Sequence, residues 1–425
     1  MREMKDSGFE WIGKIPVNWE VDKLKFHLKR NEPRNPGDTV VLSLYRELGV
    51  IPKDSRDDNH NVTSEDTSKY KYVQPGDFVI NKMKAWQGSV AVSEYEGIVS
   101  PAYFIYKFTD NAFYRRYFHY LLRSCYKDEF MRLSGGIRVG QWDLPSVALD
   151  NTAVIIPPMK EQKSIAAFLD VKCSEIDALT ADIQTQIDTL EQYKRSVISE
   201  AVTKGLNPDV EMKDTGIEWF GAIPTEWAIR KGKYMFAQRS LRGNSVELQL
   251  LSPTQKFGVI PQNLYEELSG MTAVKLNEKA DLNTLKTIHK GDFCISLRSF
   301  QGGFEYCKHE GVVSPAYQVF YPTVPISDGY YKYLFKESGF IEKMNSYTMT
   351  LRDGKNIAFS DFGNTYIPYP PVETQSEIAL YLDKKCAEIN KVIMDKQSQL
   401  ATLDEYKKSL IYEYVTGKKE VPENA

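Results

Sequence analysis

The feature that most constrains this chain is that its sequence begins again halfway along. The segment MKDSGFEWIGKIPVNW from Met4 returns from Met212 as MKDTGIEWFGAIPTEW. Further blocks return in the same order about 210 residues later: LSLYRELGVIP and LSPTQKFGVIP, EGIVSPAY and EGVVSPAY, FLDVKCSEID and YLDKKCAEIN, LEQYKRSVISEAVT and LDEYKKSLIYEYVT. Recurrence in a fixed order is the signature of a tandem repeat. The sequence therefore predicts two copies of one unit, each a globular domain followed by a long helix.

The globular part of each copy reads as mixed helix and strand. Short apolar runs such as FVINKM and GIVSPAYFIYKF, bounded by Gly, Pro and Asp, are typical of strands, and NAFYRRYFHYLLRS and DGYYKYLFKESGFIEKM have helical spacing. We expect α/β or α+β domains and leave the strand order open. The predicted parts are a first domain at 1–157, a first long helix at 158–205, a second domain at 206–370, a second long helix at 371–417 and a tail at 418–425.

Apolar residues at intervals of seven define both long helices. The first seam consists of Leu169, Ile176, Ile183, Leu190 and Val197, with Cys173 and Ile187 adjoining it and Leu179 and Tyr193 expected to fill it in. The second consists of Leu382, Ile389, Leu403 and Leu410, interrupted by Lys396. A strict seven-residue period favours a coiled coil. The alternative is two separate amphipathic helices, each packed on its own domain.

The coiled coil is expected to be antiparallel, because parallel pairing needs a long return of the chain. Antiparallel pairing relates the two domains by a pseudo-twofold axis. Duplex DNA is a ligand that is itself long and roughly twofold, so a duplicated domain suits it.

Composition narrows the class of protein without deciding it. With 42% hydrophobic and 26% charged residues, the chain can build real cores. Its net charge of −3 argues weakly against nucleic-acid binding, but net charge averages over domains. Five cysteines without a CxxC pair indicate a reducing, cytoplasmic compartment. We find neither a signal-peptide pattern nor a run of about 18 apolar residues, so no membrane association is expected.

Signatures of an active site are missing from both copies. There is no GxxxxGK[ST] phosphate loop, no GxGxxG after a strand and no HExxH, and the histidines have no cysteines at metal-ligand spacing. NPDVEMKD resembles a nuclease metal site, but only Val210 separates Asp209 from Glu211, and we interpret the segment as a linker. The chain is therefore expected to have no catalytic residues and no metal site. An enzyme with an unfamiliar site and a general DNA- or protein-bridging scaffold are the alternatives.

Three pairs of equivalent loops carry side chains that could contact DNA. Lys and Arg hold phosphates or the O6/N7 edge of guanine, and Gln can pair bidentately with adenine. The candidates are Tyr45, Arg46, Lys82, Lys84, Gln87, Arg138 and Gln141 in the first copy, and Gln255, Lys256, Arg298, Gln301, Arg352, Lys355 and Asn356 in the second. When the two copies of the repeat are compared, we expect Tyr45 to be equivalent to Gln255 and Arg46 to Lys256. Trp86 is expected in the core, and the SPAY segments are expected to be structural.

Taken together, these motifs identify a family resemblance over essentially the whole chain. The chain resembles the specificity subunit of type I restriction-modification systems. The similar features are the openings GxxEWxGxIPxxW at Gly8 and Gly216, the GDF…QG and SPAY blocks, the IPPxxEQ-like entries into the long helices, and the closing LxxYKxSxIxExVT runs.

The resemblance implies two target-recognition domains, each reading one half of a bipartite, asymmetric sequence in double-stranded DNA. It implies that the antiparallel coiled coil sets the spacer and docks two modification (methyltransferase) subunits, which restriction (endonuclease) subunits then join. It also implies that S-adenosylmethionine, ATP and magnesium belong to those partners, and that this chain is a DNA-recognition subunit without catalysis of its own.

Overall fold

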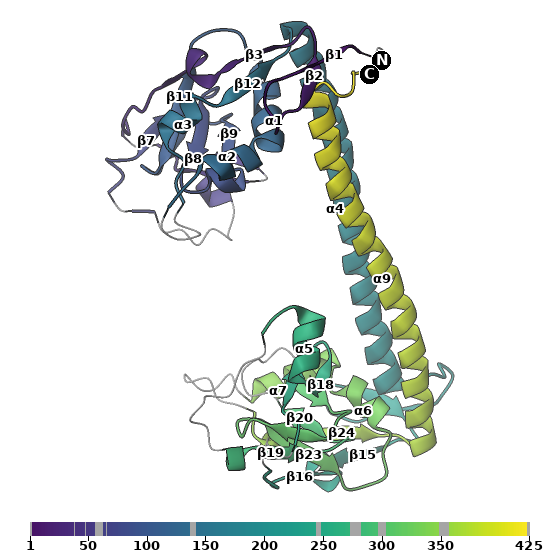
Figure 1. The fold of residues 1–425 in the computed structure, drawn as a ribbon. Helices are drawn as coiled ribbons and strands as arrows, with labels where there is room; N and C mark the ends of the chain where they lie inside the picture. The colour runs from purple at the N-terminus through teal and green to yellow at the C-terminus, as the bar shows by residue number, and fades with distance from the viewer. Residues whose placement is uncertain are drawn as a thin grey trace. The chain divides into compact units, whose positions relative to one another are not determined.

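The chain folds into two compact units, shown in a computed structural model (Figure 1). The first unit comprises Met1–Ile183 and Ser398–Ala425, and the second comprises Gln184–Gln397. The structure describes residues 2–37, 39–46, 48–55, 63–64, 66–136, 142–243, 248–272, 282–295, 303–347 and 357–422. Each unit therefore combines one globular domain with parts of both long helices, and the linear segments expected from the sequence are not the compact units.

The first unit contains the first globular domain. Its strands are β1 (Met4–Asp6), β2 (Lys14–Pro16), β3 (Glu20–Lys23), β4 (Leu28–Arg30), β5 (Leu42–Tyr45), β6 (Gly49–Pro52), β7 (Lys71–Val73), β8 (Phe78–Asn81), β9 (Val90–Val92), β10 (Gly97–Val99), β11 (Tyr103–Phe108) and β12 (Ala153–Ile156). Its helices are α1 (Arg115–Cys125), α2 (Lys127–Leu133) and α3 (Ser146–Asp150), with 3-10 turns η1 (Leu24–Phe26), η2 (Lys53–Ser55) and η3 (Ala85–Gln87). The mixed helix and strand predicted from the sequence is confirmed.

The second unit contains the second globular domain. Its strands are β13 (Met212–Asp214), β14 (Ala222–Pro224), β15 (Ala228–Lys231), β16 (Phe236–Gln238), β17 (Leu251–Thr254), β18 (Gly258–Pro261), β19 (Lys286–Ile288), β20 (Phe293–Ile295), β21 (Phe304–Tyr306), β22 (Gly311–Val313), β23 (Gln318–Pro322) and β24 (Tyr366–Tyr369). Its helices are α5 (Gln262–Ser269), α6 (Asp328–Leu334), α7 (Ser338–Ser346) and α8 (Phe359–Asn364), with 3-10 turns η4 (Gly232–Tyr234) and η5 (Leu282–Thr284).

The two domains have the same strand topology, which the sequence left open. The antiparallel sheet of the first has the order β4-β11-β8-β9, and that of the second has the equivalent order β16-β23-β20-β21. Smaller pairs repeat as well, including β5-β6 with β17-β18 and β7-β10 with β19-β22. The parallel bridge between Val41 and Ile98 has its counterpart between Leu250 and Val312. The repeat is therefore one of hydrogen-bonding pattern as well as of sequence.

One long helix follows each globular domain along the chain. These helices are α4 (Met159–Lys204) and α9 (Val372–Val415). Of the predicted seam residues, Leu169, Ile176, Ile183, Leu382, Ile389 and Leu410 are buried, and Leu190, Val197 and Leu403 are half-buried. No helix in the part of the chain that the structure describes combines the length and the apolar character needed to cross a bilayer.

Hydrogen bonds within each unit show that the helices pair antiparallel. In the first unit Lys407 of α9 donates to Asp177 of α4 at 2.5 Å, and in the second unit Lys194 of α4 donates to Asn390 of α9 at 2.7 Å. A second contact in each unit gives the direction, since Phe168 meets Tyr414 in the first unit and Gln186 meets Lys396 in the second. Within each unit, residue numbers on one helix therefore rise as those on the other fall, which defines antiparallel pairing. Lys396, the polar interruption of the second seam, donates to Gln186 in the second unit.

The prediction that Leu179 and Tyr193 complete the first seam is wrong. Both side chains are 48% exposed, whereas Cys173 and Ile187 are buried. In a coiled coil, each apolar residue that recurs every seven positions is accompanied by one second apolar residue, three or four positions further along the same helix. Cys173 and Ile187 occupy that partner position four residues after Leu169 and Ile183. Leu179 and Tyr193, three residues after Ile176 and Leu190, point to solvent.

Each domain core includes the start of one long helix and the end of the other. In the first unit, Ile165 and Leu169 of α4 join Leu410 and Tyr414 of α9 in the main core. In the second unit, Ala201 and Val202 of α4 join Ile378 and Leu382 of α9. The expectation of a coiled coil and its alternative of helices packed on domains are thus both partly realised, because the helix ends also belong to the domain cores.

The IPPxxEQ entry into each long helix is explained by one buried glutamine. Gln162 accepts a hydrogen bond from the backbone of Tyr114 at 2.8 Å and donates to the carbonyls of Ala112 and Pro157 at 2.7 and 2.8 Å. Gln375 does the same in the second unit, with Ser327 and Pro370 as partners, both at 2.8 Å. The motif therefore anchors the first turn of each helix to its domain.

Candidate nucleic-acid interface

The turn between β5 and β6 carries the first two candidate residues. The strands pair Tyr45 with Gly49, which leaves Arg46 exposed at the tip of the hairpin. Gly49 has φ +77°, a conformation that side chains disfavour, and a Cβ there would come within 3.3 Å of the His119 ring. The sequence GVIP therefore begins with the residue that this close packing requires.

The loop after β8 carries the next three candidates. Lys82 forms an ion pair with Asp143 at 2.6 Å. Lys84 lies just before η3 and is exposed, and its side chain has no hydrogen bond or ion pair with any residue that the structure describes. Gln87 ends η3, where its backbone N–H donates to the Lys84 carbonyl at 3.0 Å. One free cation and one amide are thus presented by a short, hydrogen-bonded loop.

The structure brings these two loops and the segment after residue 141 together. Arg46 Nη2 donates to Gln87 Oε1 at 2.6 Å, joining the β5–β6 turn to η3. The rings of Trp86 and Trp142 meet edge-to-face at 5.6 Å between centroids. Trp86, expected in the core, is half-buried in this contact instead. Three sequence blocks far apart along the chain therefore form one surface, which the spacing alone did not predict.

Helix α1 supports this surface from beneath with two residues that the sequence did not single out. Arg123 donates to the backbone carbonyl of Arg46. His119 is half-buried, and its Nδ1 accepts from the backbone of Val92 at 3.4 Å. Burial, reinforced by the positive charge of Arg123, lowers the pKa of His119 to about 3, so the ring is neutral at physiological pH. No motif marks such supporting residues, because their role depends on which turn lies against the helix.

The equivalent turn of the second domain corrects the predicted pairing of residues. Since Thr254 pairs with Gly258 as Tyr45 pairs with Gly49, the counterpart of Arg46 is Gln255, and Lys256 corresponds to position 47. The sequence comparison had set Arg46 opposite Lys256, one residue too far along. Gln255 and Lys256 are both exposed at the tip of the β17–β18 hairpin.

Helix α5 borders this hairpin on one side. A hollow of 720 Å³ lies between the turn and the helix, with Lys256, Phe257, Tyr265 and Met271 among its lining residues. The first domain has the short η2 turn at the corresponding place after β6. The same scaffold thus presents different side chains and a different neighbouring element in its two copies.

Several candidates fall outside the described residues. These are Arg138 and Gln141 in the first domain and Arg298, Gln301, Arg352, Lys355 and Asn356 in the second. Their assignment as DNA-contacting residues stays a prediction from the sequence.

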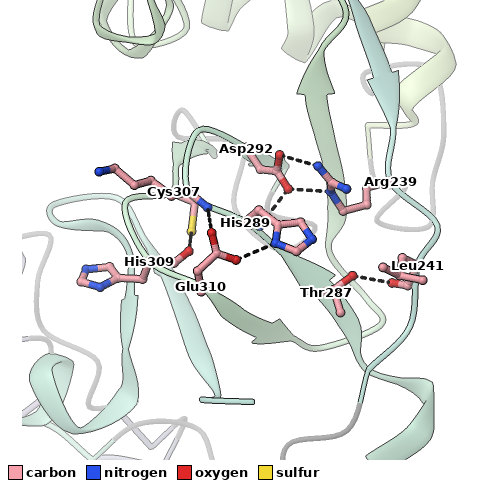
Figure 2. Close-up of polar contacts among 9 residues, drawn as sticks. Arg239, Leu241, Thr287, His289, Asp292, Cys307, His309 and Glu310 are labelled. Atoms are coloured by element: carbon pink, nitrogen blue, oxygen red, sulfur yellow. Dashed lines mark hydrogen bonds and ion pairs between the residues drawn. The ribbon is translucent and has the colours of Figure 1, made fainter. Parts of the chain in front are cut away.

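A network of polar contacts in the second domain stabilises the turn between β19 and β20 (Figure 2). Arg239 forms a bidentate pair with Asp292 at 2.7 and 3.0 Å. Asp292 also accepts from the backbone of His289 at 2.9 Å, and the His289 ring meets Glu310 at 2.5 Å. The Arg239 guanidinium binds this carboxylate through Nε and Nη2, so it connects the end of β16 to the turn. We assign the network to structure.

The SPAY segments form hydrogen-bonded turns, which agrees with the structural role expected of them. In the first domain Tyr103 N donates to the Ser100 carbonyl at 3.0 Å, and in the second Tyr317 N donates to the Ser314 carbonyl at 3.1 Å. A lysine closes each turn, since Lys71 donates to Tyr103 O at 2.6 Å and Lys286 to Tyr317 O at 2.7 Å.

Neither metal-site geometry nor an activated thiol is found among the residues that the structure describes. They contain no group of three or more His, Cys, Asp or Glu side chains placed to hold a metal ion. Burial raises the pKa of Cys125 and of Cys307 to about 12. Both thiols are therefore protonated near neutral pH, and a thiolate nucleophile is not available at either position.

Comparison with known proteins gives consistent matches. Residues 16–189 match the model of the type I restriction modification DNA specificity domain. The chain is 23% identical to the MjaX type I restriction enzyme specificity subunit of Methanocaldococcus jannaschii over 436 residues, covering 96% of this chain and 95% of the relative. It is 24% identical to the MjaVIII specificity subunit of the same organism over 428 residues, covering 95% and 94%.

Among solved structures, the fold is similar to one from a study of complex assembly and conformational transition of the type I R-M system. The TM-score is 0.69 at 14% identity, covering 95% of this chain and 99% of the other. At this identity the likeness supports the fold alone.

Proposed function

Because the chain belongs to the family of type I restriction-modification specificity subunits, we propose that it is the sequence-specificity subunit of such a complex. Each globular domain reads one half of a bipartite, asymmetric site in double-stranded DNA. The observation that carries this proposal is one scaffold used twice with different exposed side chains, such as Arg46 in the first hairpin and Gln255 at the same position of the second.

We propose that the chain itself performs no chemistry. Methylation and cleavage then reside in modification and restriction subunits, and S-adenosylmethionine, ATP and magnesium are held there. The protonated thiols of Cys125 and Cys307 support this assignment, since they remove two groups from consideration as nucleophiles. The cysteines are free thiols, which fits a reducing compartment, and we infer that the complex works in the cytoplasm.

Two modification subunits dock on the paired helices in this proposal. Leu179 and Tyr193 of α4 are each 48% exposed, and their repeat equivalents Val392 and Tyr406 of α9 are 43% and 55% exposed. Positions flanking a coiled-coil seam usually carry charged residues. Here four large apolar side chains occupy them, two in each unit, so each unit offers one copy of the same apolar surface. Exposed apolar surface that recurs with the repeat suits two copies of one partner.

The length of the paired helices sets the spacer between the two half-sites. Inserting seven residues after Thr180 of α4 and seven at the facing position of α9 preserves the seam and adds about 10 Å to the pair. At 3.4 Å per base-pair step, the spacer should lengthen by about three base pairs while both half-sites stay the same. If the two helices are lengthened and the DNA spacer stays the same, helix length does not set the spacer.

The deciding experiment is a map of methylated bases. The chain is expressed with its cognate modification subunit in a methylation-free host, and methylated adenines are located throughout the genome. A bipartite motif with a fixed gap is the expected result. No methylation by a complex that assembles and binds S-adenosylmethionine would contradict the specificity role and leave a bridging scaffold as the function to test.

A further inference from the structure

We propose that the first domain recognises a guanine through the paired side chains of Arg46 and Gln87. The inference rests on the proposed function and adds to it the identity of one base in one half-site. It starts from the 2.6 Å hydrogen bond between Arg46 Nη2 and Gln87 Oε1.

This hydrogen bond determines which groups the pair has left to offer. An arginine side chain only donates, so its partner on glutamine must be the carbonyl oxygen. The amide NH2 of Gln87 and the remaining N–H groups of Arg46 have no hydrogen-bond partner among the residues that the structure describes. Exposed Arg46 and half-buried Gln87 together therefore present hydrogen-bond donors to the outside.

A surface of donors matches one base edge best. In the major groove guanine offers two acceptors, N7 and O6, whereas adenine offers one acceptor and one donor. A glutamine that reads adenine uses both its carbonyl oxygen and its NH2. Arg46 already uses one of the two lone pairs of the Gln87 carbonyl oxygen. The pair therefore presents more donors than acceptors, which favours guanine over the adenine pairing considered for this glutamine.

The pair is held in place from both ends. Arg123 of α1 donates to the Arg46 carbonyl, and the Gln87 backbone is bonded to Lys84 within η3. A long side chain that is already ordered loses less conformational freedom on binding. Arg123 is thus a positioning residue, which orients the reading pair without contacting the base.

The inference is limited to one half-site, because the second domain carries other residues at two of these positions. Gln255 stands where Arg46 does, and Lys336 stands where Arg123 does. Lys336 forms an ion pair with Glu305 at 2.5 Å. The segment equivalent to η3 lies outside the described residues of the second domain.

The test is the methylation map of the complex carrying Arg46→Ala. One G·C position in one half-site should become degenerate, with discrimination there reduced by about 5- to 150-fold, and the other half-site should be unchanged. Gln87→Glu keeps a partner for Arg46 but removes the NH2 donors, so it should weaken preference at the same position. If the position that relaxes is A·T, or if the motif does not change, guanine reading by this pair is wrong.

Arg123→Ala tests the positioning role separately. Arg123→Ala should relax the same G·C position. Arg123→Lys keeps a donor for the Arg46 carbonyl, so it should restore part of the preference even if Arg123→Ala also lowers stability. Arg116→Ala is the matched control, because this α1 arginine contacts Asp170 and Glu94 and not the turn. A wild-type complex without a bipartite motif would refute the proposed function, whereas a wild-type motif that Arg46→Ala leaves intact refutes only this inference.

Discussion

The hydroxyl of Tyr117 donates a buried 2.8 Å hydrogen bond to the carbonyl of Val415, which lies 298 residues further along the chain. The repeat reproduces it in the second unit, where Tyr330 donates to the carbonyl of Val202 at 2.6 Å. In each unit a helix of the globular domain thus binds the last turn of the long helix that begins in the other copy of the repeat. The ends of both long helices are thereby part of the domain cores.

Tyr117→Phe should lower the free energy of unfolding of the first unit by about 1–3 kcal/mol, because it leaves the buried Val415 carbonyl without a donor. Urea unfolding and hydrogen exchange of residues 411–417 measure the effect. Tyr114→Phe is the control, since Tyr114 is exposed. Equal stability of the two variants would show that the hydrogen bond contributes nothing.

Gln162→Ala should destabilise the start of α4 by about 2–4 kcal/mol. Three hydrogen bonds of a fully buried amide are lost, and each is worth about 1 kcal/mol with a further cost for unsatisfied groups. Thermal unfolding measures the loss, and Gln375→Ala should repeat it in the second unit. Gln184→Ala, an exposed position on the same helix, should change little. If Gln162→Ala behaves like Gln184→Ala, the motif does not anchor the helix.

The second unit should lose stability as pH rises from about 5 to 8. Burial raises the pKa of Glu305 from its usual 4.5 to about 7, and the nearby Lys336 offsets only part of this. Between those two values the folded state binds more protons than the unfolded state. Rising pH therefore favours unfolding through this window, by about 3 kcal/mol at most.

Glu305→Gln should flatten this pH dependence, because the amide does not titrate and still accepts from Lys336. Denaturant unfolding at pH 5.5, 6.5 and 8 provides the comparison. Glu342→Gln, an exposed carboxylate on α7, should retain the wild-type slope. An unchanged slope in Glu305→Gln would mean that another group governs the transition.

Charged substitutions in the exposed apolar surface of one unit should remove the modification subunit that docks there and leave the other bound. The pair Leu179→Glu and Tyr406→Glu alters the first unit, and Tyr193→Glu and Val392→Glu alters the second. Native mass spectrometry of the complex should show one bound copy in place of two. Gln184→Glu, which is exposed but outside the apolar surface, is the control. Two bound copies in either double variant would show that this surface is not where the modification subunits dock.

Much of the fold was predictable from sequence patterns, and the misses have local causes. Of the residues that the seven-residue spacing placed in the seam, six are buried: Leu169, Ile176, Ile183, Leu382, Ile389 and Leu410. The prediction failed at Leu179 and Tyr193, because spacing alone does not say whether the third or the fourth following residue packs inward. The pairing of Arg46 with Lys256 was wrong by one position, although the glycines of the two GVIP segments, Gly49 and Gly258, already align Arg46 with Gln255 in the sequence.

The duplication, the mixed helix-and-strand class, the two long helices and the family resemblance could all be read from the amino-acid sequence. They depend on order and periodicity along the chain, which are visible without coordinates. Three contacts became visible only in the folded chain: Arg46 with Gln87, Arg123 with the Arg46 carbonyl, and Val415 with the core of the first domain. Such contacts join residues that are far apart in the chain, and no local pattern encodes which of many possible partners the packing brings within hydrogen-bond distance.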